Sequence, residues 1–208
     1  MKVGLIGYGE LGKQVESLLI DQGITENSII RFDDYGFNNN NVHPFNSYLN
    51  KEFADYNFLV CLGYKHFKSK IDIIESLLFH DRKITNFIHK SAYLNPNITI
   101  GKSVIIFPMC NIDQNVHIEN GVILHNTVTI SHNTRIGRCS YIAPGVNISG
   151  NVKIGDDCFI GTGTSITNSI EIGDNTRIGI GSCVTNSIKP NSSCIGNPLR
   201  YVNRLTIL

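Results

Sequence analysis

The chain has 208 residues, with 18 basic and 17 acidic side chains and a formal net charge of +1. This balance argues against nucleic acid as a main partner, because phosphate binding needs a concentrated basic face. No apolar run approaches the ~20 residues of a membrane-spanning helix, and the apolar start is too short for a signal-peptide core. The six cysteines form no C-x-x-C pair, so we expect reduced packing residues in a cytoplasmic protein.

The N-terminal part alternates short apolar strands with helical stretches. The strands are expected at residues 2–7, 28–34, 58–63 and 84–88, the helices from the first glycines to about residue 22 and over 65–79, and a loop with a short helix over 35–57. Strands that alternate with helices are typical of a parallel α/β domain. We therefore predict a small Rossmann-like domain over residues 1–88.

A glycine motif, Gly7-x-Gly9-x-x-Gly12, follows the first strand and opens the first helix. With Asp33 about twenty residues further on, it matches the dinucleotide fingerprint, in which glycines let the backbone approach phosphate at a helix N-terminus. The domain is too short for the two halves that NAD needs, so a nucleotide or nucleotide sugar is expected. Asp33 and Asp34 would accept hydrogen bonds from its base or hydroxyls. The alternative is a tight turn that only glycine can make, followed by a solvated aspartate pair.

Every sixth residue from Leu94 to Val184 is aliphatic, over sixteen consecutive positions. This period fits neither a helix nor a half-buried strand. It predicts a parallel β-solenoid of about five coils, each made of three six-residue units. We place the solenoid at residues 89–190, ending where Pro190 breaks the repeat, and expect residues 191–208 to form a tail over the last coil.

A second set of small or β-branched residues stands two positions before these aliphatics and should fill the corners of each coil. Its members are Val104, Cys110, Val116, Val122, Val128, Thr134, Ser140, Val146, Val152, Cys158 and Thr164.

His132 follows an inward aliphatic by two positions, so it should point outward at a corner, where histidine can act as a general base. Gly150 comes eighteen residues later, directly above it, and offers space and a backbone N–H beside the ring. This pairing suits thioester chemistry, with a base for the nucleophile and a donor for the oxyanion. The alternative is a surface histidine without a role. His125 is a candidate for lining the same groove or a structural residue, and for His117 no role is expected.

Three histidines on a solenoid also resemble a carbonic anhydrase of the gamma class, which places three histidines on zinc. Residues 128–132 begin like that family's motif, but the fifth position beyond His132 is Gly137. A third zinc ligand is therefore not evident, and we predict no metal.

The glycine turn followed by hexapeptide repeats resembles the bacterial sugar acyltransferases of the NeuD/PglD type, over nearly the whole chain. The resemblance implies a small Rossmann-like domain and then a left-handed parallel β-helix, and thus α/β plus all-β architecture. It implies acetyl transfer from acetyl-CoA to a nucleotide-linked amino sugar for a surface polysaccharide, or to a sialic acid hydroxyl. It also implies a homotrimer in which acetyl-CoA lies between adjacent β-helices.

Carried over by position, the resemblance makes His132 the general base and the Gly150 N–H the oxyanion donor. The closing residues 196–200 resemble the family's Gly-x-Pro-Ala-(Lys/Arg) ending, near the coenzyme. The positions implied in coenzyme binding are Tyr141, Gly150, Thr162, Gly179, Ile180, Gly181 and Pro198. The positions implied in holding the nucleotide sugar are Gly9, Glu10, Leu11, Asp33, Asp34, Gly63 and His125.

The chain departs from the family at positions that read substrate. Asn133 follows the base, at a position where the family often has an acid. An acid there would favour the protonated imidazole and so tune the base, whereas asparagine carries no charge. Tyr141 replaces a histidine that contacts the coenzyme, and His125 replaces an asparagine that contacts the sugar. These changes indicate a different sugar or nucleotide from that of the best-known members.

The predicted function is an N-acetyltransferase in which the amine of a nucleotide-linked amino-deoxysugar attacks the thioester directly. No cysteine or serine is evidently paired with a base, so we expect no acyl-enzyme. Phe107 and Phe159, as outward apolar residues, would agree weakly with a trimer. Sugar O-acetyl transfer uses the same base and donor and stays open as the alternative, as do the nucleotide, the sugar and the acyl group. A non-catalytic scaffold would need neither His132 nor the glycine motif.

Overall fold

The computed structural model describes residues 1–34 and 41–203, so residues 35–40 of the predicted loop and residues 204–208 of the predicted tail lie outside the described residues. Contacts divide the chain into two units, Met1–Phe87 and Ile88–Leu208. Neither α-helix of the described part has the length and apolarity needed to cross a membrane.

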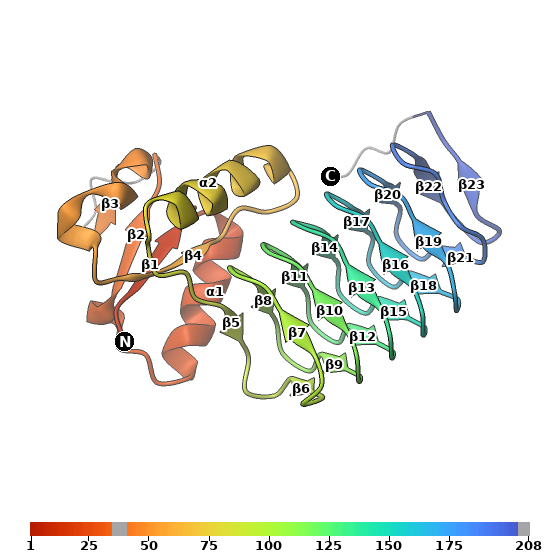
Figure 1. The fold of residues 1–208 in the computed structure, drawn as a ribbon, viewed down its shortest axis with the longest axis horizontal. Helices are drawn as coiled ribbons and strands as arrows, with labels where there is room; N and C mark the ends of the chain where they lie inside the picture. Colours follow the sequence, from red (N-terminus) through yellow and green to blue (C-terminus); the bar gives the residue numbers. More distant parts are fainter. Residues whose placement is uncertain (35–40, 204–208) are drawn as a thin grey trace. The chain divides into compact units, whose positions relative to one another are not determined.

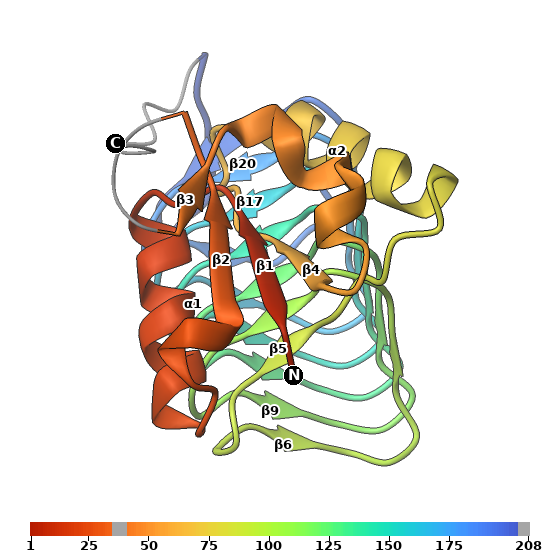
Figure 2. The same cartoon turned by 90° about the vertical axis from the view of Figure 1, so that its left-hand side faces the viewer.

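The first unit is a parallel sheet of four strands in the order β3-β2-β1-β4 (Figure 2). Helix α1 connects β1 to β2, and α2 follows β4. The strands are β1 (Val3–Ile6), β2 (Ile29–Phe32), β3 (Val42–His43) and β4 (Asn57–Val60). The helices are α1 (Glu10–Asp21) and α2 (Phe67–Phe79), with 3-10 turns η1 (Glu26–Ser28), η2 (Phe45–Leu49) and η3 (Lys51–Phe53). Because β2 and β4 flank β1, the chain reverses direction across the sheet at β1, where α/β proteins bind ligands.

Each residue of β1 and β2 is buried, as expected for central strands of a parallel sheet covered on both faces. Phe32 packs edge-on against Phe53 and Tyr48 at centroid distances of 5.1 and 6.4 Å. The structure differs from the prediction at the end of this unit. Ile84 forms only an isolated bridge with Phe58, and the strand expected over 84–88 is reduced to β5 (Phe87–Ile88). Strand β3 was not predicted, because two residues between polar segments carry no periodic signal.

The second unit is a parallel β-solenoid of three sheets, as predicted, and its strands stack in columns in Figure 1. Sheet I contains β6 (Tyr93–Leu94), β9 (Asn111–Ile112), β12 (Thr129–Ile130), β15 (Asn147–Ile148), β18 (Ser165–Ile166) and β21 (Cys183–Val184). Sheet II contains β7 (Thr99–Ile100), β10 (His117–Ile118), β13 (Arg135–Ile136), β16 (Lys153–Ile154) and β19 (Glu171–Ile172). Sheet III contains β5, β8 (Ile105–Ile106), β11 (Ile123–Leu124), β14 (Tyr141–Ile142), β17 (Phe159–Ile160), β20 (Arg177–Ile178), β22 (Ser193–Ile195) and β23 (Arg200–Tyr201).

The chain visits sheets I, II and III in turn, so each coil has three corners. The first corner joins sheet I to sheet II, the second joins II to III, and the third joins III to I. Strands of successive coils pair with a spacing of 18 residues, as between His117 and Arg135 (135 − 117 = 18). A residue therefore lies above the residue eighteen positions earlier in the sequence.

The six-residue period forms the core of the solenoid. The aliphatic positions from Ile106 to Val184 are at most 3% exposed, and the predicted second set of corner residues is buried with them. Leu94 and Ile100, in the first coil, are partly buried against this core. The hydrophobic effect of stacking these side chains stabilises coils whose two-residue strands would not form alone.

The solenoid continues beyond the predicted end at Pro190. Strand β22 pairs in parallel with β20, with Arg177 opposite Ser193, a spacing of 16 residues (193 − 177 = 16). Pro190 does not break the ladder because it lies at the second corner against Gly173, and its neighbour Asn191 donates its N–H to the coil below. The last coil is therefore two residues shorter, and β23 then pairs antiparallel with β22.

Candidate active site

The imidazole of His132 lies against the backbone of Gly150 at the first corner. His132 is exposed and Gly150 is buried. A Cβ atom built on Gly150 would lie 2.6 Å from Cε1 and 2.7 Å from Nε2 of His132, closer than van der Waals contact allows. Any side chain at position 150 would therefore displace the ring. The structure brings the predicted base and the predicted oxyanion donor together within one chain.

The peptide group between Ser149 and Gly150 is held at both ends. The buried Thr134 hydroxyl donates to the Ser149 carbonyl at 3.2 Å. The Gly150 N–H donates to Oδ1 of Asn168 at 3.1 Å. The sequence analysis missed Asn168, although its position eighteen residues beyond Gly150 indicates that the two residues are stacked neighbours. In this structure the predicted oxyanion donor already has an acceptor.

Asn133 links His132 to the neighbouring coils. Its Nδ2 lies 3.1 Å from Nδ1 of His132 and donates to Oδ1 of Asn151 at 3.2 Å. Its Oδ1 accepts from Nδ2 of Asn115 at 3.1 Å. The three asparagines have positive φ angles of 56, 57 and 58°, a left-handed conformation that asparagine tolerates better than most residues. Asn133 thus positions the ring through a neutral amide where a carboxylate would bring charge.

The buried cysteines are poor nucleophiles. Burial raises the pKa of Cys110 and Cys158 to about 11 and that of Cys61 to about 12. A thiol with such a pKa is protonated near neutral pH, and the thiolate is the reactive form. These values agree with the expectation that the cysteines pack the core, and all six are free.

One serine does lie beside a histidine, which the sequence analysis did not anticipate. Ser91 Oγ is 2.8 Å from Nδ1 of His89 and also accepts the N–H of Met109 at 3.0 Å. The hydroxyl thereby ties the first coil to the next, which is a structural role. Among the described residues, no group of three His, Cys, Asp or Glu side chains is placed to hold a metal ion.

Four of the residues implied in coenzyme binding lie at a different corner from His132. Thr162 follows β17, and Gly179, Ile180 and Gly181 follow β20, so all four stand at the third corner. Ile180 is 68% exposed, and Gly181 adopts a φ of +61° that favours glycine. Pro198 lies between β22 and β23. Within one chain, the width of sheet I separates these residues from the first corner.

Four aromatic rings form a column on the outer side of sheet III. His125 stacks on Phe107 at 4.3 Å and lies 5.2 Å from Tyr141, which stacks on Phe159 at 5.5 Å. Desolvation lowers the pKa of His125 from its usual value, although a hydrogen bond that the ring donates to the Asn126 side chain opposes the shift. Within one chain His125 begins the third corner and His132 lies at the first, so a groove shared by the two residues stays a prediction.

The same column corrects the expectation for the two phenylalanines. Phe107 is 3% exposed and Phe159 is 8% exposed, because each stacks on a neighbouring ring in this column. Neither is a free apolar surface for a partner.

The three glycines of the turn in the first unit have two different roles. Gly7 has a φ of +92° and donates its N–H to Phe32 at 2.9 Å. A Cβ on Gly12 would lie 2.4 Å from the Gly7 carbonyl oxygen, so both glycines are required by the turn. Gly9 is different: it precedes the first residue of α1, and a Cβ there would meet nothing within 4 Å. The middle glycine thus leaves the helix N-terminus open, where an anion is favoured.

The other predicted nucleotide-sugar residues of this unit follow the carboxyl ends of β1, β2 and β4 along the same edge of the sheet. Asp33 accepts the Tyr8 N–H at 2.6 Å, and Asp34 accepts the Phe45 N–H at 3.3 Å. Each aspartate therefore supports a loop with one carboxylate oxygen. Gly63 follows β4 and has open space beside it.

The first two residues of α1 complete this set. Glu10 is exposed and pairs with Lys13 at 3.2 Å, and Leu11 is half-buried.

A buried ion pair beneath the turn was missed by the sequence analysis. Arg31 bonds to Glu16, and the Tyr8 hydroxyl donates to the other carboxylate oxygen of Glu16. The Arg31 guanidinium also lies 5.3 Å from the centroid of the Tyr8 ring. Burial and the neighbouring Glu16 raise the pKa of Tyr8. The signal in the sequence was an arginine inside an otherwise apolar strand, since a buried charge needs a partner.

Comparison with known proteins supports this architecture. Residues 151–186 match the family model described as bacterial transferase hexapeptide (six repeats). No curated protein matches the chain in a sequence search.

Three solved structures share its fold over almost the whole length. The acetyltransferase domain of PglB from Neisseria gonorrhoeae is 24% identical, with a TM-score of 0.86, covering 97% of this chain and 99% of that chain. The same domain in complex with acetyl coenzyme A is 25% identical, with a TM-score of 0.86, covering 97% and 98%. PerB from Caulobacter crescentus in complex with CoA and GDP-perosamine is 22% identical, with a TM-score of 0.87, covering 98% of both chains. Together these matches confirm the resemblance to the NeuD/PglD-type sugar acyltransferases.

Proposed function

We propose that this protein is an acetyl-CoA-dependent acyltransferase that acetylates the amine of a nucleotide-linked amino sugar. The observation that carries the proposal is the contact between His132 and Gly150, since a side chain at position 150 would displace the imidazole. A base and a backbone donor side by side at an outer corner match the two needs of thioester aminolysis. The complex of a 25% identical acetyltransferase domain with acetyl coenzyme A supports the choice of donor.

In the proposed reaction the amine nitrogen attacks the carbonyl carbon of the acetyl thioester. A C–N bond forms, the carbonyl oxygen becomes an oxyanion, and the Gly150 N–H stabilises it. His132 accepts the proton that the nitrogen loses. The C–S bond then breaks, and the CoA thiolate leaves and receives that proton, so one amide and one thiol are formed.

The first unit supports the choice of a nucleotide-linked amino sugar as the acceptor. The open backbone at Gly9 and the N-terminus of α1 suit a phosphate, and the edge of the sheet carries Asp33 and Asp34 for base or hydroxyl contacts. The complex of PerB with GDP-perosamine, on the same fold, makes that sugar nucleotide one member of the panel to test. A sugar hydroxyl as acceptor is the second candidate, because the same base and donor serve it.

The distribution of the predicted coenzyme residues favours an assembly of several copies. His132 and Gly150 lie at the first corner, whereas Thr162 and Gly181 lie at the third corner of the same solenoid. A second copy that supplied one of the two sets would bring both sets to the same coenzyme molecule. We therefore propose a homotrimer with acetyl-CoA between adjacent solenoids. Sedimentation is expected to give a trimer, and a monomer at micromolar concentration would contradict the shared site.

The experiment that tests the activity is release of free CoA thiol from acetyl-CoA with a panel of UDP-, dTDP- and GDP-linked amino sugars and hydroxyl acceptors. Turnover with one amino sugar is expected, and His132→Ala should lower kcat by about 10² to 10⁴. His117→Ala removes another exposed imidazole of the same solenoid and should leave kcat unchanged. A His132→Ala rate close to the wild-type rate would refute the assignment of the base. The proposed acyltransferase activity would be refuted if no acceptor of the panel caused release of CoA thiol and if acetyl-CoA did not change the melting temperature.

A further inference from the structure

The Asn168 side chain accepts the N–H that is the proposed oxyanion donor. Its Oδ1 accepts the Gly150 N–H at 3.1 Å, and Asn168 itself is exposed while Gly150 is buried. For this N–H to contact a thioester oxygen, the oxygen must come to the place that Oδ1 holds, because one N–H points in one direction. The amide of Asn168 and the substrate are therefore competitors for one donor.

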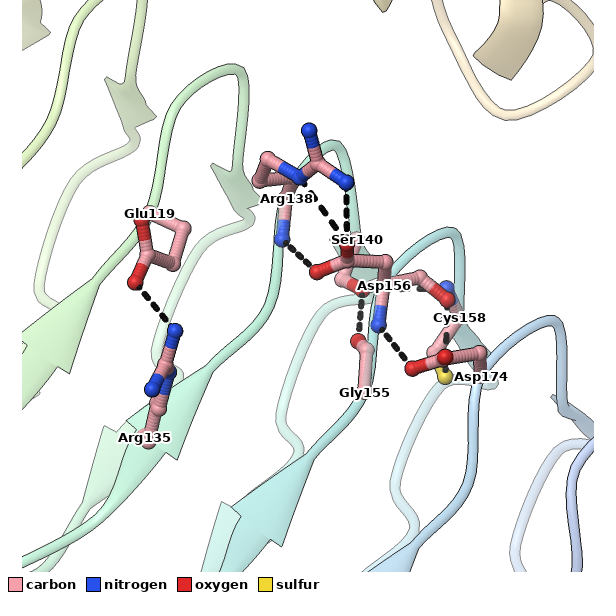
Figure 3. Close-up of polar contacts among 8 residues, drawn as sticks. All are labelled: Glu119, Arg135, Arg138, Ser140, Gly155, Asp156, Cys158 and Asp174. Atoms are coloured by element: carbon pink, nitrogen blue, oxygen red, sulfur yellow. Dashed lines mark hydrogen bonds and ion pairs between the residues drawn. The ribbon is translucent and has the colours of Figure 1, made fainter.

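The same contact recurs at the second corner, where it has a purely structural setting. Asp156 accepts the Arg138 N–H at 2.7 Å, and Asp174 accepts the Asp156 N–H at 2.8 Å, each from the coil below (Figure 3). Asn120 accepts the Lys102 N–H at 2.8 Å in the same way. Either a carboxylate or an amide thus fills this role in the fold. At the first corner, in the coil above Gly150, the acceptor is the neutral amide of Asn168.

The direction of the donor does not depend on Asn168 alone. Thr134 holds the carbonyl of the Ser149–Gly150 peptide at 3.2 Å, and the Gly150 carbonyl accepts the Ser169 N–H at 3.0 Å. The first bond holds the peptide plane that carries the Gly150 N–H, and the second holds the next peptide, so the backbone on both sides of Gly150 stays in place when the Asn168 side chain moves away. What Asn168 adds is an acceptor for a buried N–H that would otherwise be unsatisfied.

We propose that Asn168 is a positioning residue that holds the Gly150 N–H in the free protein and yields it to the thioester oxygen during acetyl transfer. This inference rests on the proposed function. Its chemical basis is the strength of the acceptor. A neutral amide oxygen is a weaker acceptor than an oxyanion, so the oxyanion that forms during acetyl transfer displaces it from the N–H. A carboxylate bonds the same N–H about twice as strongly and would repel the oxyanion.

The experiment compares two pairs of variants that change the same chemistry at the two corners. Asn168→Asp should lower kcat by about 10², the loss typical of removing one oxyanion donor, while KM for acetyl-CoA changes much less. Asn168→Ala should keep kcat at or above the wild-type value, because the donor is left open. Asn120→Asp and Asn120→Ala, which act on the Lys102 N–H, should leave kcat unchanged. Melting temperatures of all four variants report whether each change affects folding.

Three results would overturn the proposal for Asn168. These are an Asn168→Asp variant with wild-type kcat, an Asn168→Ala variant that loses activity as His132→Ala does, and an equal loss of kcat in Asn120→Asp. If Asn168→Asp does not fold, the kcat of Asn168→Ala alone tests the proposal. A wild-type protein that releases no CoA with any acceptor refutes the proposed function itself, whereas an active wild type with indifferent Asn168 variants refutes only this inference.

Discussion

His132 and Gly150 are eighteen residues apart in the sequence and in contact in the fold, with space beside Gly150 only for a hydrogen atom. Since a Cβ there would lie 2.6 Å from the His132 ring, Gly150→Ala should push the imidazole from its place. The ring is exposed and has room to move, so the melting temperature should change little. We expect kcat to fall by about 10² or more.

Steady-state kinetics and thermal unfolding measured on the same samples check this prediction. Ser149→Ala is the control, because it changes the preceding side chain without adding an atom beside the ring. A Gly150→Ala enzyme with normal kcat would show that the ring position does not matter for the reaction.

Asn133→Asp should shift the pH dependence of acetyl transfer. Asn133 Nδ2 lies 3.1 Å from Nδ1 of His132, so the substitution places a carboxylate beside the imidazole. A nearby negative charge favours the protonated ring, which cannot accept a proton. The acid limb of the pH–rate profile should therefore move to higher pH. Asn175→Asp is the control, since Asn175 has the same left-handed backbone and amide ladder at the second corner. Identical pH–rate profiles for the wild type and Asn133→Asp would show that the side chain at position 133 does not influence the His132 ring during the reaction.

His125 should make the protein less stable in mild acid. Desolvation in the aromatic column lowers its pKa in the folded state below the unfolded value of about 6.5. The unfolded state then binds more protons as the pH falls, so stability is lost as the pH falls through about 6.5 and below. His125→Phe preserves the stack on Phe107 and removes the titrating group. The melting temperature should drop less between pH 7.5 and pH 5 in this variant than in the wild type, with His117→Phe as the exposed control. An equal drop in wild type and His125→Phe would refute this origin of acid sensitivity.

The three glycines of the turn should separate into two kinds. Gly12→Ala places a Cβ 2.4 Å from the Gly7 carbonyl oxygen and should cost about 1–3 kcal/mol of stability. A Cβ at Gly9 meets no neighbour within 4 Å, so Gly9→Val should lower the melting temperature less than Gly12→Ala does, while affinity for the nucleotide sugar falls. Calorimetric titration and thermal unfolding measure the two effects. Unchanged affinity in Gly9→Val would show that the motif is only a turn.

The sequence by itself determined the solenoid and the position of His132 on it. A strict period of six fixes which side chains enter the core, because the hydrophobic effect admits only one register of the coil. Three such units per coil place Gly150 above His132 by counting alone. The alternation of strands and helices likewise determined a parallel sheet whose carboxyl edge gathers Gly9, Asp33 and Gly63.

Only the tertiary structure decided how the outward side chains are used. The Gly150 N–H already bonds to Asn168, and Asp33 supports the Tyr8 N–H of the glycine turn. Pro190 shortens one coil without ending the ladder. His125 lies in a stack at the third corner and not beside His132. A repeat specifies where each backbone position lies, but the direction of a polar side chain depends on which neighbouring groups still need a hydrogen-bond partner, and those groups are set by residues far apart in the sequence.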